Sequence, residues 1–215
     1  NKRTPVKVNL RFRDKGLLKE IFSFSVWTTV GSLAQRLIFN ITPSIIAAVS
    51  VTGSIGVALF GLGQTIEGYV YLFASALSGM FMPRVSKIIQ KGERSSELMP
   101  LMIKIGRIQC LIVGLLVTGF IAVGSSFIVD IWNRPEFAGS YLCTVFLIIP
   151  CLLDYPMDIA YTTLVVENKV KLQACIYLLV GVINVFLLLI LSRYFGALGA
   201  SISIFISYTI RALLM

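Results

Sequence analysis

The chain has 215 residues, of which 57% are hydrophobic and 13% are charged, and its formal net charge is +9. A soluble domain needs roughly a quarter of its residues charged to cover its surface, so this composition excludes a soluble enzyme and indicates a membrane protein. The basic residues flank apolar runs and no base-reading motif accompanies them, so we expect no nucleic-acid partner.

The chain begins with a polar, basic segment, residues 1–20, and is largely apolar from there to its end. Apolar runs long enough to cross a bilayer follow one another, separated by short polar stretches. The predicted spans cover residues 21–51, 55–82, 108–129, 141–166, 172–191 and 196–215. The sequence therefore predicts an all-α, polytopic membrane protein with one six-helix transmembrane bundle over residues 21–215.

The prolines and the two chain ends refine the predicted spans. Pro43 should bend the first span, Pro83 should end the second, and Pro150 and Pro156 interrupt the fourth. The chain starts at Asn1 rather than Met and stops inside an apolar run. We therefore expect a piece of a longer protein, with its last span truncated.

The loops alternate in their content of Lys and Arg. Basic residues are frequent in residues 1–20, 84–107 and 167–171, whereas the loops between them hold only Arg134 and Arg193. Cytoplasmic loops carry the excess of Lys and Arg in membrane proteins. The pattern predicts a multi-pass protein of the inner (plasma) membrane with both ends on the cytoplasmic side.

Two charges lie near the middle of the first two predicted spans. Arg36 and Glu67 fall on consecutive antiparallel helices, so they can meet at a similar depth. A charge inside a span is costly unless it is paired or hydrated. Either the two residues form an ion pair that locks the helices, or they line a cavity in which Arg36 binds an anionic phosphate and Glu67 gates it or relays a cation.

Asp154 and Asp158 are four residues apart and therefore share one helical face. The flanking prolines should free backbone carbonyls and open the helix here. Two carboxylates in a low-dielectric site repel each other, so one of them can take up a proton, and the same oxygens can instead bind a cation. A third interpretation is that this end of the helix reaches cytoplasmic water.

Uncharged polar residues inside the spans are weaker candidates for a functional site than the charged ones. Gln35, Asn40 and Gln64 can contact a substrate or form hydrogen bonds between helices, and the same holds for Asn184. The chain has no histidine, and its four cysteines form no CxxC pair and are expected to be small buried hydrophobic residues. We therefore expect no metal site, no cofactor and no catalytic residue.

Four stretches follow one another along the chain: FSFSVWTTVGSLAQRLIFNITPSIIAAV (22–49), GSIGVALFGLG (53–63) with the later FMPRVSK (81–87), VVENKVKLQACIYLLVGVINVFLLL (165–189) and RYFGALGASIS (193–203). Their order resembles the C-terminal half of a polysaccharide, or lipid-linked oligosaccharide, flippase of the multidrug/oligosaccharidyl-lipid/polysaccharide exporter superfamily. The resemblance covers nearly the whole chain.

The resemblance implies a transporter built from two six-helix bundles around a central cavity, of which this chain would be one half and the missing N-terminal half the other. It implies the flipping of an undecaprenyl-diphosphate-linked oligosaccharide, a repeat unit of polysaccharide or O-antigen, from the cytoplasmic to the outer leaflet. Basic cavity residues serve the diphosphate in such proteins, and Arg36 matches that role by position. A proton or sodium ion at Glu67 or at the Asp154 and Asp158 pair would supply the coupling. The implied partners are the lipid-linked glycan and membrane lipids.

Two other functions remain open. A multidrug or cation antiporter of the same superfamily would neutralise cationic substrates with its carboxylates, and the spans hold three carboxylates against Arg36. A membrane-embedded glycosyltransferase or polymerase subunit would need a large polar loop, and the longest loop, residues 84–98, offers only Glu93 and Glu97 as acids. We therefore expect a transporter rather than an enzyme.

Overall fold

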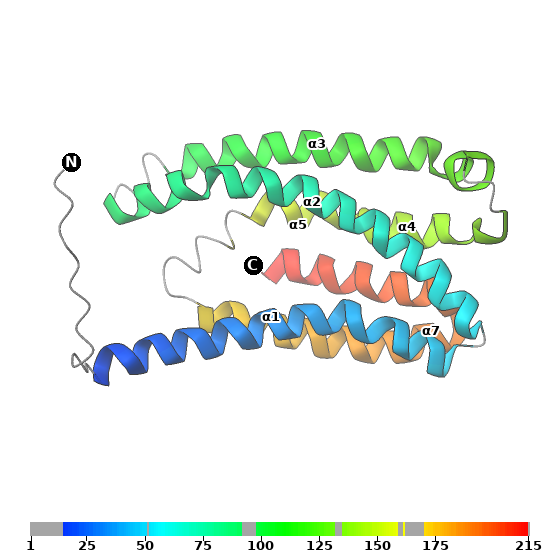
Figure 1. Cartoon of the computed structure of the whole chain (residues 1–215), viewed down its shortest axis with the longest axis horizontal. Helices are drawn as coiled ribbons and strands as arrows, with labels where there is room; N and C mark the ends of the chain where they lie inside the picture. Colours follow the sequence, from blue (N-terminus) through cyan, green and yellow to red (C-terminus); the bar gives the residue numbers. More distant parts are fainter. Residues whose placement is uncertain are drawn as a thin grey trace, which may run out of the picture.

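The computed structural model describes residues 15–50, 52–91, 98–131, 135–158, 161 and 170–214. Within these ranges every regular element is a helix, which confirms the prediction of an all-α chain. The elements are α1 (Lys15–Val49), α2 (Gly53–Lys91), α3 (Met99–Ser126), η2 (Phe127–Ile131), η3 (Pro135–Phe137), α4 (Ser140–Ile148), α5 (Cys151–Asp154), η4 (Tyr155–Met157) and α7 (Val170–Leu214) (Figure 1).

Five segments among the described residues are long and apolar enough to cross a membrane, by length and composition: Ile21–Val49, Gly53–Ile88, Met99–Ile131, Ser140–Met157 and Val170–Leu214. The outer faces of these helices are also apolar. Leu111 and Leu115 on α3 are 75% and 74% exposed, and Val182 on α7 is 70% exposed. A water-soluble bundle rarely leaves such contiguous apolar faces uncovered.

Two of the predicted spans are longer as helices than as apolar runs. We expected the second span to end at Pro83 and a loop and connector to fill residues 84–107, but α2 continues to Lys91 and α3 begins at Met99. This part of the prediction was wrong. The extensions pack together through a small core of their own, made of Val85, Ile88, Leu98, Leu101 and Ile105. Hydropathy marks where a helix is apolar all round, whereas these turns bury one face and expose cations on the other.

The fourth predicted span is broken where its prolines predict. Helix α4 ends at Ile148, the short helix α5 starts after Pro150, and the 3-10 turn η4 contains Pro156. The remaining predicted helix of this span, residues 162–166, lies outside the described residues. Pro43, in contrast, lies inside the continuous helix α1.

Helix α7 contains the last two predicted spans and turns back on itself between them. Gly196 has a non-helical backbone with φ 59° and ψ −132°, and the orange and red parts of α7 lie antiparallel in Figure 1. We call residues 170–195 the first arm and residues 197–214 the second arm. Asn184 Nδ2 of the first arm donates a hydrogen bond of 3.2 Å to Ser207 Oγ of the second, so Asn184 serves contact between helices.

The main core lies where α1, α2, α4 and both arms of α7 meet. Its fully buried residues include Ile46, Phe60, Leu147, Leu188 and Ile204. A second core joins α2 and α3 to the segment from α4 to η4 and includes Val113, Val117 and Ile148. The cysteines divide between core and surface: Cys143 and Cys151 are buried as expected, but Cys110 and Cys175 are exposed on the outer faces of their helices. That last pair corrects our expectation, because residue type alone does not say which side of an apolar helix is packed.

Candidate functional site

A polar cleft of about 490 Å³ opens between α1 and α2, near the middle of the bundle. This volume lies within the range of roughly 300–1,000 Å³ typical of small-molecule sites. The cleft contains four predicted substrate contacts and one predicted coupling residue together. Its lining consists of Ser32, Gln35, Arg36, Phe39, Asn40, Gln64, Glu67, Gly68, Tyr71, Tyr155, Tyr208 and Arg211.

Helical periodicity explains why these residues share one surface. On α1, Gln35, Arg36 and Asn40 are spaced by one or four residues and project to the same side. The opposite side of α1 carries Ala34 and Ile38, which are only 5% and 3% exposed. Packing that apolar side into the bundle therefore turns the polar side of α1 toward α2.

Four charged residues lie at nearly one depth in the bundle. Arg36 and Glu67 are each about 14 residues from the turn that joins α1 to α2, and Asp154 and Arg211 are about equally far from the start of α4 and from the turn at Gly196. At 1.5 Å per residue this is roughly 20 Å. A hydrocarbon layer is about 30 Å thick, so these four residues form a charged layer inside an apolar bundle.

Asp154 and Arg211 form a buried ion pair at the centre of this layer. Arg211 Nε donates a hydrogen bond of 2.9 Å to Asp154 Oδ1, and a second guanidinium nitrogen contacts Oδ2. The hydroxyl of Tyr161 also donates to Asp154 Oδ1, at 3.1 Å. The two charged side chains are 3% and 7% exposed. The carboxylate is therefore neutralised and its oxygens are occupied.

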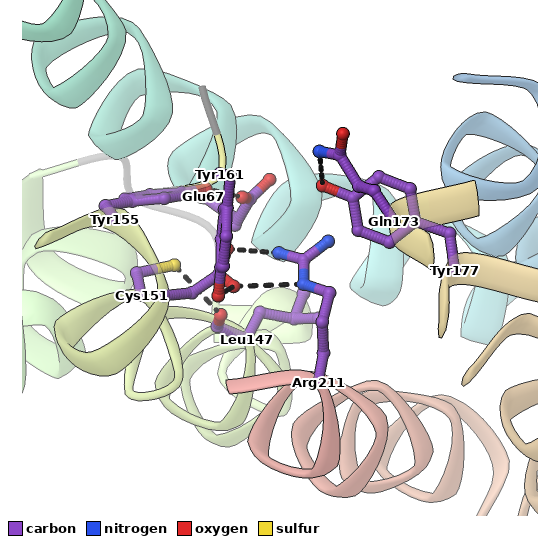
Figure 2. A network of polar contacts seen from close by, with 9 residues as sticks. Glu67, Leu147, Cys151, Tyr155, Tyr161, Gln173, Tyr177 and Arg211 are labelled. Atoms are coloured by element: carbon purple, nitrogen blue, oxygen red, sulfur yellow. Dashed lines mark hydrogen bonds and ion pairs between the residues drawn. The ribbon is translucent and has the colours of Figure 1, made fainter. Parts of the chain in front are cut away.

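Tyrosines enclose the other side of the Arg211 guanidinium. Its central carbon lies 4.0 Å from the centroid of the Tyr208 ring and 5.5 Å from that of Tyr177. Gln173 donates a hydrogen bond of 3.2 Å to the Tyr177 hydroxyl. Figure 2 shows Arg211 reaching from the second arm of α7 into this group, with Tyr161 and Tyr177 on either side of it.

We expected Asp154 and Asp158 to share one helical face as neighbouring carboxylates, but the structure pairs Asp154 with Arg211. Residues 151–157 combine one turn of α-helix with a 3-10 turn, so the spacing of four does not define a regular helical face. Asp158 is half-buried beyond that turn. We overlooked Arg211 in the sequence, although one charge in the apolar run from Phe195 to Met215 is a signal for a buried partner.

Glu67 is held by a tyrosine rather than by Arg36. The hydroxyl of Tyr155 donates to Glu67 Oε1, and the Tyr155 ring lies 5.7 Å from that of Tyr71. No ion pair joins Arg36 to Glu67 or to any other carboxylate of the described residues. The cleft therefore contains one exposed guanidinium, on Arg36, that is not neutralised within the described part of the chain.

Aromatic rings form much of the remaining surface of the cleft. Phe39 and Tyr208 are 5.8 Å apart between centroids, and Tyr71 and Tyr155 form the second pair. The amide side chains of Gln35, Asn40 and Gln64 line the same cleft. Within the described ranges, no three His, Cys, Asp or Glu side chains lie together as a metal site would require. The cleft can thus offer a cation, neutral hydrogen-bonding groups and flat apolar rings.

No protein-family model matches this chain, and no curated protein or solved structure is similar to it. The resemblance to the oligosaccharide flippases therefore depends on the four stretches of sequence alone, and function must be argued from the geometry of the cleft.

Proposed function

We propose that the chain crosses the plasma membrane six times, through α1, α2, α3 with η2, the segment from α4 to η4, and the two arms of α7. Five long apolar segments and their exposed apolar faces support insertion. The turn at Gly196 lets one long helix supply two crossings. With the alternating Lys and Arg content, this arrangement has both chain ends in the cytoplasm.

Labelling of introduced cysteines tests this topology. In a variant without the four native cysteines, we expect Ala138→Cys to react with a membrane-impermeant maleimide on intact cells, because this exposed residue lies in a proposed outer loop. Met99→Cys, at the exposed start of α3, should react only after the cells are permeabilised. Labelling of both positions on intact cells would contradict six crossings with this orientation.

The proposed function is transport of an anionic, lipid-linked oligosaccharide from the cytoplasmic to the outer leaflet, with no covalent chemistry. The observation that supports it most is the Arg36 guanidinium in the cleft, which no described carboxylate neutralises. A guanidinium binds two phosphate oxygens in parallel, so it suits a diphosphate. The cleft is open, which would let the lipid tail remain in the bilayer while the polar head enters.

The rest of the cleft suits the glycan. Sugar rings present C–H groups to aromatic faces and hydroxyls to amide side chains. The ring pairs Phe39–Tyr208 and Tyr71–Tyr155 offer the faces, and Gln35, Asn40 and Gln64 offer neutral donors and acceptors. Neutral polar contacts of this kind bind a sugar without requiring a charge on it.

A cation or multidrug antiporter is the second candidate, because Glu67 also lines the cleft. The ion pair with Arg211 removes Asp154 from the acids that could serve a cation, and Tyr155 holds Glu67. Arg36 is exposed in the cleft, whereas Glu67 is half-buried and hydrogen-bonded to Tyr155, so the more accessible charge is positive and favours an anion. In the flippase proposal Glu67 would bind the coupling proton or sodium ion, and the second bundle of the transporter would close the open side of the cleft.

Arg36→Ala tests the flippase proposal in cells whose surface glycan depends on this protein. We expect glycan export to fall by about tenfold to a hundredfold at normal protein level, because one charge-assisted contact to the diphosphate is lost. Arg36→Lys should restore much of it, and Arg193→Ala, which removes an exposed cation outside the cleft, should leave it unchanged. Normal export by Arg36→Ala would overturn the proposal, and loss of drug export in Glu67→Gln alone would favour the antiporter.

A further inference from the structure

A second cavity, of about 430 Å³, lies at the end of the bundle opposite to the α1–α2 turn. It brings the start of α1 together with the start of the described part of α7. Its described side chains are two cations, one hydroxyl and apolar or aromatic groups, and none of them is a carboxylate: Lys19, Ser23, Phe24 and Trp27 from α1, and Val170 and Lys171 from α7. None of these residues belongs to the polar cleft.

The helices hold this cavity at a definite depth. Helix α1 and the first arm of α7 run parallel in close contact, because Gly31 lets the Tyr177 ring approach to 3.5 Å of where a Cβ would lie. Trp27 is about 23 residues from the end of α1, and Lys171 is about as far from the turn at Gly196 in α7. At 1.5 Å per residue, each distance is roughly 35 Å. The hydrocarbon layer is about 30 Å thick, so both lie at its cytoplasmic boundary. Lys19 lies about 10 Å further out, at the depth of lipid head groups.

We propose that this cavity binds the phosphate of an anionic phospholipid of the inner leaflet. Lys19 and Lys171 would contact the phosphate from two sides and Ser23 would donate a hydroxyl hydrogen bond. Trp27 is half-buried at the boundary, where its ring can contact the first part of an acyl chain and its N–H the head group. Basic pockets between helices at the cytoplasmic face are suited to such lipids, and each Lys there contributes to the attraction.

This site goes beyond the proposed transport and shares only its membrane placement. The lipid would be a resident of the membrane rather than the cargo, because the two cavities share no lining residue and their nearest lining residues on α1, Trp27 and Ser32, are more than one helical turn apart. A bound lipid would hold the start of α1 against the first arm of α7.

Fluorescence quenching tests the site in the whole chain, reconstituted into neutral phosphatidylcholine vesicles. The chain has two tryptophans, so Trp132→Phe leaves Trp27 as the single fluorophore. We expect brominated phosphatidylglycerol to quench Trp27 half-maximally at a mole fraction about tenfold or more below that of brominated phosphatidylcholine. The double variant Lys19→Gln/Lys171→Gln should lose this preference. Lys104→Gln/Arg107→Gln, which removes two exposed cations of α3 outside the cavity, should keep it.

Any other outcome would overturn the proposal of a phospholipid site. Equal quenching by the two lipids would refute it while leaving the membrane placement and the transport proposal intact. Equal loss of preference in both double variants would mean general surface attraction. If millimolar inorganic phosphate removed the preference for phosphatidylglycerol, the cavity would be a site for free phosphate instead. Quenching by neither lipid would refute the membrane placement of Trp27 together with the site.

Discussion

Asp154→Asn is expected to destabilise the bundle by about 3–5 kcal/mol, because it leaves the Arg211 guanidinium buried without a counter-charge. The two side chains are 3% and 7% exposed, and the pair links the second arm of α7 to the segment after Pro150. Within the described residues, Asp154 is the one carboxylate that forms an ion pair with Arg211. Unfolding of the purified chain in mild detergent, followed by loss of helical circular dichroism, measures the change.

Two controls separate the ion pair from the chemistry of the substitution. Asp130→Asn makes the same change at an exposed position in η2 and should alter stability by less than about 0.5 kcal/mol. The double variant Asp154→Leu/Arg211→Met removes both charges and keeps apolar volume, so it should recover most of the lost stability. A double variant as unstable as Asp154→Asn would show that the hydrogen bonds of the network, rather than the unpaired charge, dominate.

Gly196→Ala is expected to weaken the packing of the two α7 arms. The backbone at Gly196 has φ 59° and ψ −132°, a region that only glycine adopts readily, and forcing a side chain there costs about 1–3 kcal/mol. A Cβ would also come within 2.9 Å of Thr52 Oγ1 and 3.1 Å of Ser50 Oγ. The turn can relieve both conflicts only by moving the arms, which would break the contact between Asn184 and Ser207. Disulfide formation between Asn184→Cys and Ser207→Cys, with and without Gly196→Ala, reports on that contact.

Gly119→Ala is the matched control for this prediction. Gly119 lies inside α3, and a Cβ there meets no atom within 4 Å. Alanine favours a helix over glycine by up to about 1 kcal/mol, so this variant should be as stable as the parent or slightly more stable. If the two alanine variants unfolded alike, and the cross-link formed equally in both, the turn at Gly196 would not need its unusual backbone.

The cleft and the ion pair also differ in what a substitution should affect. Arg36 is exposed in the cleft and has no partner in the described part of the chain, so its replacement should change transport and leave unfolding nearly unaltered. Asp154 and Arg211 are buried and satisfied by each other, so their replacement should change unfolding first. This contrast distinguishes a residue that binds cargo from residues that hold helices together.

The sequence by itself determined the class of the protein and much of the cleft. Long apolar runs predicted helices, and the described residues form five helices long and apolar enough to cross a membrane. Arg36 and Glu67 were predicted to lie at one depth because both fall near the middle of consecutive antiparallel spans. Gln35, Asn40 and Gln64 were predicted only as weaker candidates for substrate contacts, and the structure places them in the same cleft.

Only the tertiary structure decided which charges meet. A buried charge requires a partner, but hydropathy and spacing do not say which one: Asp154 is paired with Arg211, 57 positions away, and Glu67 with Tyr155, 88 positions away. These choices depend on how α2, the segment after Pro150 and the second arm of α7 are rotated against each other. The extensions of α2 and α3 beyond their apolar runs were likewise missed, because hydropathy marks helices that are apolar all round, whereas those turns are stabilised by packing against each other.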